Sequence, residues 1–360
     1  MSESKSLTKA VSAELKSKFD LDKFKTKKLL NTNVKYKNQK WVPLSPAFND
    51  IISLPGLPMG NITILRGHSD TGKTTAMLES AEYVQKMGIL PVFIITEMKF
   101  SWQYAKNCGL EFNEVLDKDG NVVNYDGFFI YKDRETLNSI EDVADFVIDL
   151  LEEQKAGNLP YDLWIMWDSI GSIPCLKSIN SKSNNNQWNA NALAEAFGNY
   201  VNQQLLLSRK ESYPYTNTLI VTNKIWVQPP DVPMAQPRVQ NKGGNAMWYD
   251  AGLVITFGGI TNQGTSKIKA MKDKKTIEFA KLTKIMVDKN HINGITSRGA
   301  IVVTDHGFIP HDNKAIEEYK KNHSKDWFSS LGEIGGEVKT VIDDLIDEKI
   351  TDVALEPNEE

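Results

Sequence analysis

The segment from Gly67 to Thr74 constrains the fold of this chain more than any other part of its sequence. It reads GHSDTGKT and fits the pattern G-x-x-x-x-G-K-[ST], between an apolar run, NITIL, and a stretch that favours a helix, TTAMLESAEYVQKM. In such a strand–loop–helix unit backbone N–H groups surround phosphate oxygens, the lysine reaches the β- and γ-phosphates, and the hydroxyl binds Mg²⁺. The sequence therefore predicts a nucleotide site, formed by Gly67, His68, Ser69, Asp70, Thr71, Gly72, Lys73, Thr74 and Thr75.

Length and composition exclude several other classes of protein. The 360 residues are 41% hydrophobic and 24% charged, and at roughly 150 residues per domain they predict about two domains. No apolar run approaches the roughly 18 residues of a membrane helix, and the polar start, MSESKSLTKA, carries no secretory signal. Cys108 and Cys175 form neither a disulfide framework nor a paired metal spacing. We therefore expect a soluble, cytoplasmic protein with no membrane partner.

The net charge of −4 conceals opposite charges at the two ends of the chain. Residues 1–40 contain eleven lysines against four acidic residues, whereas residues 341–360 contain eight acidic residues and one lysine. Apolar positions four residues apart predict an amphipathic helix in the basic segment, at Leu7, Val11, Leu15 and Phe19. Either the two ends meet between neighbouring subunits, or the basic end attracts and the acidic end repels the same polyanion, or they are two solvated tails.

From residue 62 onward, short apolar runs alternate with longer helical stretches. The runs that predict strands are Ile62–Arg66, Val92–Thr96, Phe128–Tyr131, Leu163–Trp167, Leu219–Thr222 and Leu253–Phe257. Helical patterns at 75–87, 139–154 and 189–209 separate several of them. Strands that alternate with helices of this length predict an α/β fold with a mostly parallel sheet.

The remainder of the chain departs from this alternation. Strands are predicted at Thr276–Asp288 and Ala300–Thr304, around turns at Asn293-Gly294 and Arg298-Gly299, and a helical region at 311–350. Two polar segments, 174–188 and 225–242, fit neither strand nor helix. Loops of this length are uncommon inside a compact domain and are usually either functional or disordered.

Two carboxylates end predicted strands near the nucleotide site. Asp168 follows LWIMW, and at that position it can hold the shell of Mg²⁺ together with Thr74. Glu97 follows PVFIIT at what would be the ligand-binding edge of a parallel sheet, where it could orient or deprotonate a water molecule. The alternative for Glu97 is an exposed residue at a strand end.

The order of these elements resembles the RecA-type DNA recombinases, particularly the short phage-encoded (UvsX-like) versions. The segment Ser45–Gly60 is similar to the stretch that leads into the family's phosphate loop, and Asp168-Ser169 to its Mg²⁺-associated pair. The resemblance implies that Glu97 is the catalytic glutamate and that Tyr104 stacks on adenine. The most specific match is Gly243–Tyr249, GGNAMWY, which resembles the motif that closes the family's second DNA-binding loop.

The resemblance gives the two irregular segments a function. Residues 174–188 and 225–242 stand where the family has its DNA-binding loops, in which cations neutralise phosphates and aromatic side chains stack on bases. The implied DNA-binding residues are Lys177, Lys182, Trp226, Arg238, Lys242, Gly243, Gly244 and Asn245.

Two positions depart from the family pattern. Lys289 and His291 stand where the family has a lysine pair that reaches the neighbouring subunit's γ-phosphate, so one cation is replaced by a histidine. Lys224 replaces the glutamine that senses the γ-phosphate, so it would reach a phosphate as a charge rather than as an amide. The short region that follows the core leaves the handling of duplex DNA open.

The sequence thus predicts a basic oligomerisation arm (1–44), a RecA-like ATPase core (45–310) and a short C-terminal region with an acidic tail (311–360). The implied function is a DNA-dependent ATPase that uses ATP and Mg²⁺, forms filaments on single-stranded DNA and exchanges strands with a homologous duplex. A loading factor and a single-strand-binding protein are candidate partners, in a phage host's cytoplasm. Two alternatives remain: a ring-shaped replicative helicase and a non-catalytic ATP-binding paralogue that scaffolds a recombinase.

Overall fold

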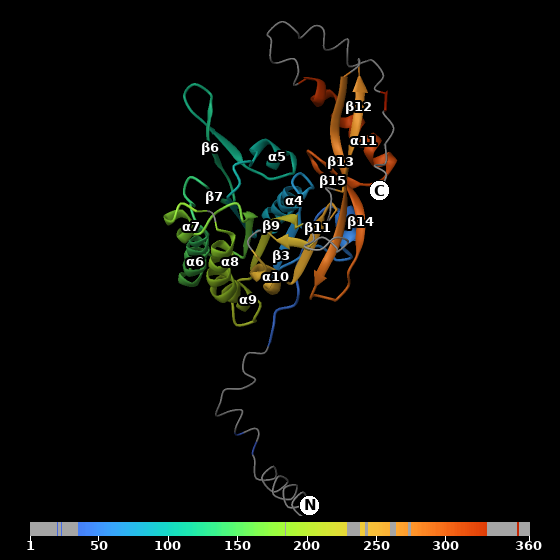
Figure 1. Cartoon of the computed structure of the whole chain (residues 1–360). Coiled ribbons are helices and arrows are strands. Elements are labelled where there is room, and N and C mark those ends of the chain that lie inside the picture. Colours follow the sequence, from blue (N-terminus) through green and yellow to red (C-terminus); the bar gives the residue numbers. More distant parts are fainter. Residues whose placement is uncertain are drawn as a thin grey trace, which may run out of the picture.

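A large, mostly parallel β-sheet runs through the computed structural model (Figure 1). The structure describes residues 20, 23, 35–183, 185–228, 238–241, 244–259, 264–272, 275–329 and 351–352. The parallel strands follow the order β11-β3-β9-β8-β4-β7. Their bounds are Leu253–Phe257 (β11), Ile62–Gly67 (β3), Asn217–Gln228 (β9), Leu163–Ile170 (β8), Leu90–Ile95 (β4) and Ile130–Asp133 (β7). The predicted α/β fold is confirmed.

Helices cover both faces of this sheet, which explains why its strands are nearly continuous apolar runs. In β8, Trp164 and Met166 point into one core while Ile165 and Trp167 point into the other, because side chains alternate along a strand. The first core lies under α3 (Pro46–Ile52) and α4 (Lys73–Lys86). The second lies under α6 (Ile140–Ala156), α8 (Asn186–Leu193), η1 (Ala194–Val201), α9 (Asn202–Leu207) and α10 (Ala246–Asp250).

An antiparallel extension continues the sheet beyond β11 and forms the orange end of the molecule in Figure 1. It contains β12 (Thr265–Lys272), β13 (Lys275–Asn290), β14 (Arg298–Thr304) and β15 (Gly307–Pro310), and β16 (Thr351–Asp352) pairs with β12. Helix α11 (Asn313–Ser329) packs on it, with the ring of Trp327 stacked 4.6 Å from that of Phe279. The turn predicted at Arg298-Gly299 is wrong, because these residues begin β14.

Two short antiparallel pairs of strands were not predicted. Strands β1 (Trp41–Val42) and β2 (Leu57–Pro58) pair beside α3, and Val42 is buried in the first core. Strands β5 (Asn113–Leu116) and β6 (Val122–Asp126) form a separate hairpin that projects from the body of the molecule in Figure 1. It follows α5 (Trp102–Asn107), and its base is held by Trp102, whose ring stacks on that of Tyr125 at 4.2 Å.

The two ends of the chain remain partly outside this description. The predicted amphipathic helix at residues 7–19 and most of the acidic tail lie outside the described residues, so both stay predictions. The predicted helical region from 311 is borne out by α11 as far as Ser329. Among the described residues, no helix is both long enough and apolar enough to cross a membrane.

Glu79 joins three parts of the fold beneath the phosphate loop. This α4 residue is 6% exposed, and its carboxylate accepts hydrogen bonds from the backbone N–H groups of Phe308 (2.6 Å) and Ser45 (3.1 Å). A Cβ at Gly307 would lie 2.5 Å from Glu79 Oε1, so only glycine leaves room for the carboxylate. Burial raises the pKa of Glu79 to about 7, although the two backbone hydrogen bonds oppose this shift.

This buried carboxyl makes the stability of the fold depend on pH. Because its pKa is about 7 in the folded chain against an ordinary 4.5, the folded state binds the proton more tightly. The free energy of unfolding therefore falls as pH rises from about 4.5 to about 7, by about 3 kcal/mol from this group. We expect urea unfolding of Glu79→Gln at pH 5 and pH 8 to show a flatter dependence than the wild type. Glu152→Gln, an exposed position on α6, is the control, and an unchanged dependence in Glu79→Gln would contradict the assignment.

Candidate nucleotide and DNA sites

The predicted phosphate loop connects β3 to α4 as a tight turn. At Gly67 an added Cβ would lie 2.2 Å from the carbonyl oxygen of Phe257, and Gly72 has a φ of 98°, so both positions require glycine. Lys73 is the first residue of α4, is 7% exposed, and donates a hydrogen bond to the carbonyl of His68. Burial lowers the pKa of Lys73 to about 8, against the attraction of Asp168 and Glu97. The loop thus presents backbone N–H groups and one buried cation at a helix N-terminus.

Asp168 lies beside the loop on β8, as predicted from its strand-end position. Its Oδ2 accepts a hydrogen bond from Thr74 Oγ1 at 2.8 Å, and its Oδ1 accepts one from Thr222 Oγ1 at 2.5 Å. Burial raises the pKa of Asp168, and the two hydroxyl donors act in the opposite direction. The carboxylate is therefore fixed in orientation by strands β8 and β9 and by the first turn of α4.

The same two side chains offer the ligands that Mg²⁺ prefers. A hydroxyl and a carboxylate oxygen are hard donors, and Mg²⁺ usually takes one or two carboxylates together with water and substrate phosphates. Among the described residues, no group of three or more His, Cys, Asp or Glu side chains is arranged to hold a metal by itself. Thr74 and Asp168 thus fit a magnesium ion that arrives with a nucleotide.

Glu97 follows β4 and reaches the same edge of the sheet. Its Oε1 accepts a hydrogen bond from Ser169 Oγ, and its Oε2 accepts one from Lys224 Nζ at 2.9 Å. The side chain is 16% exposed, so the alternative of a solvated strand-end glutamate does not hold. Burial alone would raise the pKa of Glu97, but the Ser169 and Lys224 hydrogen bonds and the positive charges of Lys224 and Lys73 outweigh it and lower the pKa. Glu97 is therefore an ionised carboxylate held beside Asp168.

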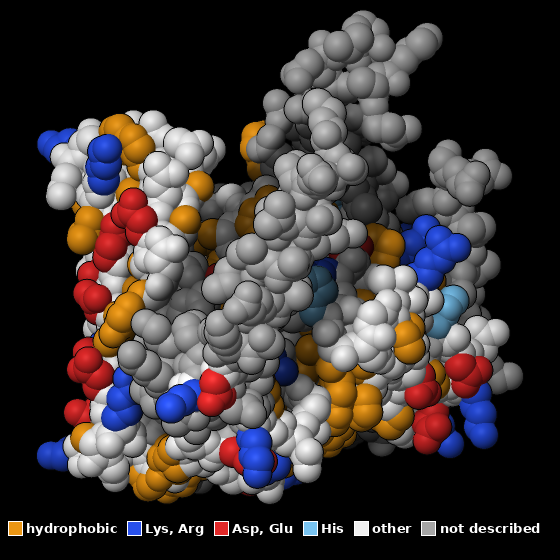
Figure 2. All heavy atoms as spheres, turned by 90° about the horizontal axis from the view of Figure 1, so that it is seen from below, with side chains coloured by type: hydrophobic (Ala, Val, Ile, Leu, Met, Phe, Trp, Pro, Cys, Tyr) orange, Lys and Arg blue, Asp and Glu red, His pale blue; other side chains and the backbone are white. Residues whose placement is uncertain are grey.

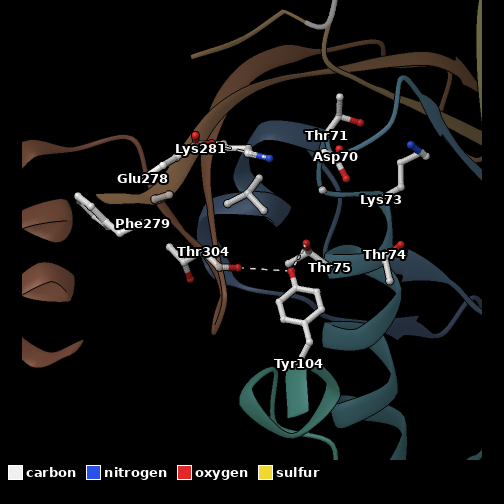
Figure 3. Close-up of a pocket in the computed structure, with 13 residues that line it drawn as sticks. Asp70, Thr71, Lys73, Thr74, Thr75, Tyr104, Glu278, Phe279, Lys281 and Thr304 are labelled. Atoms are coloured by element: carbon white, nitrogen blue, oxygen red, sulfur yellow. Dashed lines mark hydrogen bonds and ion pairs between the residues drawn. The ribbon is translucent and has the colours of Figure 1, made fainter. Parts of the chain in front are cut away.

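A cavity of about 310 Å³ opens between the phosphate loop and strands β13 and β14 (Figure 3). Tyr104 lies in its wall, where its hydroxyl hydrogen-bonds with Thr75 Oγ1 at 2.6 Å and donates to the Thr304 carbonyl at 3.4 Å. Desolvation raises the pKa of Tyr104. The tyrosine predicted to stack on adenine is thus part of a pocket that begins at the phosphate loop, and its contact with a base stays a prediction.

The opposite wall of this cavity carries a lysine that the sequence did not indicate. In Figure 3 the side chain of Lys281, on β13, extends toward Asp70 and Thr71 of the phosphate loop. Nearby, Glu278 Oε2 forms an ion pair with Lys267 Nζ at 2.8 Å, and Glu278 Oε1 lies 3.9 Å from Lys281 Nζ. Because the closer partner of Glu278 is Lys267, the ammonium of Lys281 is only loosely paired with it and faces the cavity.

Lys289 and His291 lie at the opposite end of the sheet from the phosphate loop, where the parallel strands begin. Lys289 pairs with Val254, which pairs with Ile64, three residues or about 10 Å along β3 from the phosphate loop. The Lys289 ammonium donates to the carbonyls of Trp248 (2.6 Å) and Tyr249 (3.0 Å). Burial lowers the pKa of Lys289, against the attraction of Asp250. Neither residue therefore approaches the phosphate loop of its own chain.

The described side chains on the face shown in Figure 2 carry charges of both signs. Figure 2 views the molecule from below, and its described rim shows lysine and arginine side chains interspersed with aspartate and glutamate. His291 is exposed just after β13. Because Lys289 and His291 are distant from the phosphate loop of their own chain, they could contact a nucleotide only on another molecule.

The first predicted DNA-binding segment, 174–188, is more regular than expected. It contains helix α7 (Leu176–Asn180) and the first residues of α8, so the prediction of an irregular loop is wrong for these parts. The Asn189 side chain accepts hydrogen bonds from Cys175 N and Ser178 Oγ, both at 2.9 Å, and anchors the helix. Lys177 and Lys182 are both exposed here, and the Lys177 ammonium lies 4.6 Å from the centre of the Trp188 ring.

The second segment, 225–242, begins and ends as a β-hairpin. Strand β9 continues to Gln228 and pairs antiparallel with β10 (Arg238–Asn241). Trp226 on β9 is 47% exposed, which suits a stacking surface for bases. The backbone of Arg238 begins β10, whereas its side chain, Lys242 and Gly243 lie outside the described residues.

The GGNA motif leads from this hairpin into α10. Gly244 has a φ of 81°, and a Cβ there would lie 2.9 Å from that of Ala190. Asn245 then precedes α10 as its N-cap residue. The next helix residues bring Trp248 over the guanidinium of Arg66, at 4.4 Å from the ring centre. Because Arg66 immediately precedes Gly67 on β3, the motif packs on the strand that carries the phosphate loop.

Among known proteins, the chain matches individual relatives over part of its length. No family model matches the chain. Over 112 residues it is 31% identical to Protein RecA of Mesomycoplasma hyopneumoniae strain J, covering 31% of this chain and 32% of that protein. This chain is similar to RecA proteins. It is 43% identical over 61 residues to Protein RecA of Wigglesworthia glossinidia brevipalpis (17% and 18% covered) and 33% identical over 72 residues to that of Roseiflexus sp. RS-1 (20% and 20%).

The similarity covers about a third or less of these relatives. It supports a relationship to the RecA type, in agreement with the fold. These three relatives are bacterial proteins, so the resemblance to the short phage-encoded versions stays a prediction.

Several site residues could not be found from sequence motifs. Thr222 fixes Asp168, Lys281 faces the cavity, and Arg66 contacts both Trp248 and Asp288. Each lies on a predicted strand, but no local motif marks the residue itself. The order of the strands in the sheet, rather than a local pattern, brings them to the site.

Proposed function

We propose that this chain is a RecA-type DNA recombinase, an ATPase that forms filaments on single-stranded DNA and pairs them with a homologous duplex. The observation that carries the proposal is that the charged groups are divided between the two ends of the parallel strands. The carboxyl ends of the strands, next to the phosphate loop, carry Lys73, Asp168 and Glu97. The opposite ends carry Lys289 and His291. Such a division suits subunits stacked head to tail, with each nucleotide completed by the next copy.

The carboxyl ends of the strands carry the groups that ATP hydrolysis needs. Bound Mg²⁺ would neutralise phosphate charge next to Thr74 and Asp168, and Lys73 would hold the β- and γ-phosphates. The oxygen of a water molecule bonds to the γ-phosphorus, the bond from that phosphorus to the β,γ-bridging oxygen breaks, and the proton of the water passes to Glu97. Lys289 or His291 of a neighbouring copy would stabilise the charge that develops on the γ-phosphate.

Two features support DNA as the partner that controls this reaction. The exposed Trp226 on the β9–β10 hairpin and the exposed Lys177 and Lys182 around α7 offer one stacking surface and two cations. The hairpin continues β9, whose Thr222 and Lys224 contact the two carboxylates of the nucleotide site. A ligand on the hairpin therefore has a direct physical connection to the reaction.

The test is ATP hydrolysis without DNA, with oligo(dT) and with duplex, across a salt series. We expect oligo(dT) to stimulate turnover strongly, and the stimulation to decrease with salt because phosphate contacts release counterions. Electron microscopy of the ATP–oligo(dT) complex should then show helical filaments. Closed six-membered rings would instead favour the replicative helicase. Nucleotide binding without DNA-stimulated turnover would favour the scaffold paralogue.

A further inference from the structure

Both oxygens of Glu97 are engaged in a way that opposes its role as a base. Ser169 donates to Oε1, and the ammonium of Lys224 stands 2.9 Å from Oε2. A general base must turn an oxygen lone pair toward the proton that it takes, within hydrogen-bond reach of the water. The oxygen that Ser169 leaves open faces an ammonium, which occupies one of its two lone pairs and lowers its affinity for a proton. The structure is therefore arranged to hold Glu97 rather than to use it.

Lys224 stands where the nucleotide site and the β9–β10 hairpin meet. It pairs with Gly67, the first residue of the phosphate loop, across strands β3 and β9. The next residue, Ile225, is the first of β9 to pair with β10, opposite Asn241. The Lys224 side chain is 34% exposed, so it is accessible to solvent as well as to Glu97. One long, flexible side chain thus spans from the candidate DNA-binding segment to the candidate base.

Asn223, the residue before Lys224, has a buried polar atom without a hydrogen bond within the described part of the chain. Asn223 is buried, and its Oδ1 has no hydrogen-bond partner among the described residues. Buried polar atoms are nearly always paired, and an unpaired one is unfavourable. The residue next to Lys224 therefore carries an uncompensated polar atom in the arrangement that holds the Lys224–Glu97 pair.

We propose that Lys224 is a positioning residue that restrains Glu97 in the absence of DNA, and that single-stranded DNA on the β9–β10 hairpin releases it. A backbone phosphate at the hairpin offers the ammonium an alternative anion, and the departure of Lys224 uncovers Glu97 Oε2 for the attacking water. Hydrolysis then becomes dependent on DNA because the base is free only when DNA is bound. The inference rests on the proposed function and assigns its regulation to one ion pair.

The experiment measures kcat and KM for ATP in the full-length chain, with and without oligo(dT). Lys224→Ala and Lys224→Gln should raise the DNA-independent kcat about tenfold, the rate equivalent of roughly 1.4 kcal/mol, while KM for ATP changes little. The stimulation by oligo(dT) should fall correspondingly. Lys224→Arg keeps a cation against Glu97 and should restore most of the DNA dependence. Lys86→Ala removes an exposed lysine that pairs with Glu82 on α4 and should behave as the wild type.

The outcomes separate the restraint from the proposed function. A DNA-independent kcat that stays unchanged or falls in both the Ala and Gln variants, with urea unfolding as in the wild type, would overturn the restraint. Loss of DNA dependence in Lys224→Arg as well would also overturn it, because the charge is retained. A wild type that oligo(dT) does not stimulate would instead contradict the proposed function. The DNA-free rates of the variants would still test the Lys224–Glu97 pair.

Discussion

Replacing Lys73 by alanine is expected to weaken ATP binding about 100-fold and to bring hydrolysis below detection. The ammonium is buried at the start of α4, and it would donate charge-assisted hydrogen bonds to the β- and γ-phosphates. Each such bond contributes roughly 1.5–3 kcal/mol, and every 1.4 kcal/mol is tenfold in affinity. Isothermal titration with ATP·Mg²⁺ measures the effect directly. An affinity within threefold of the wild type would remove Lys73 from the phosphate site.

The stability of the Lys73→Ala chain should change far less than its affinity. Burial lowers the pKa of Lys73 to about 8, which means that the folded protein already opposes this positive charge. Removing it relieves that desolvation, although Asp168 and Glu97 lose a favourable neighbour. Thermal unfolding without nucleotide is the control that separates lost binding from lost folding. Lys73→Arg retains the charge on a longer side chain and tests whether position as well as charge is required.

The same variant distinguishes a filament from a passive scaffold. If ATP lies between subunits, binding of nucleotide favours the assembled state, so a chain that cannot hold ATP also assembles poorly on DNA. Lys73→Ala should then lose ATP-dependent binding to oligo(dT) in fluorescence anisotropy. A scaffold protein whose DNA contacts are independent of nucleotide would retain that binding.

Local patterns were sufficient for the parts of the site that lie close together in sequence. The phosphate loop needs Gly67, Gly72 and Lys73 within one turn, so a single motif predicts it. Asp168 and Glu97 follow apolar runs, and parallel strands present their carboxyl ends at one edge of a sheet. Their proximity could therefore be predicted before the order of strands was known.

The contacts that control these carboxylates could not be predicted in this way. Thr222 reaches Asp168, and Lys224 reaches Glu97, only because β9 lies between β3 and β8. Strand order is a long-range property that a local apolar run does not determine. The same holds for Lys281, which faces the cavity because β13 runs antiparallel beside β11 and β14.

The incorrect local predictions have identifiable physical causes. Residues 174–188 look irregular because they are rich in Asn and Ser, yet α7 is stabilised by the distant side chains of Asn189 and Glu141. Gly299 suggested a turn, but it lies within β14, where a Cβ would be 2.9 Å from Ile51 Cγ1. That glycine allows α3 to approach the sheet closely, which is a requirement of packing rather than of chain reversal.

The second large effect is expected from Glu97→Gln, which should bind ATP and oligo(dT) normally but hydrolyse ATP about 10²–10⁴-fold more slowly. Glutamine has nearly the shape of glutamate and can still accept a hydrogen bond from Ser169, so the edge of the sheet should keep its structure. What it lacks is a carboxylate that can take the proton of the attacking water. Single-turnover hydrolysis with radiolabelled ATP measures the chemical step apart from product release.

Ser169→Ala is the matched control for this prediction, because it removes the hydrogen bond to Oε1 and leaves the carboxylate in place. Its rate should fall much less than that of Glu97→Gln if the carboxylate itself is the base. Should Glu97→Gln turn over ATP at the wild-type rate, Glu97 would be a structural partner of Lys224 and not a participant in the chemistry. The slow variant has a further consequence: since hydrolysis releases the filament in the proposed scheme, Glu97→Gln filaments on oligo(dT) should persist after dilution, whereas wild-type filaments should disassemble as ATP is consumed.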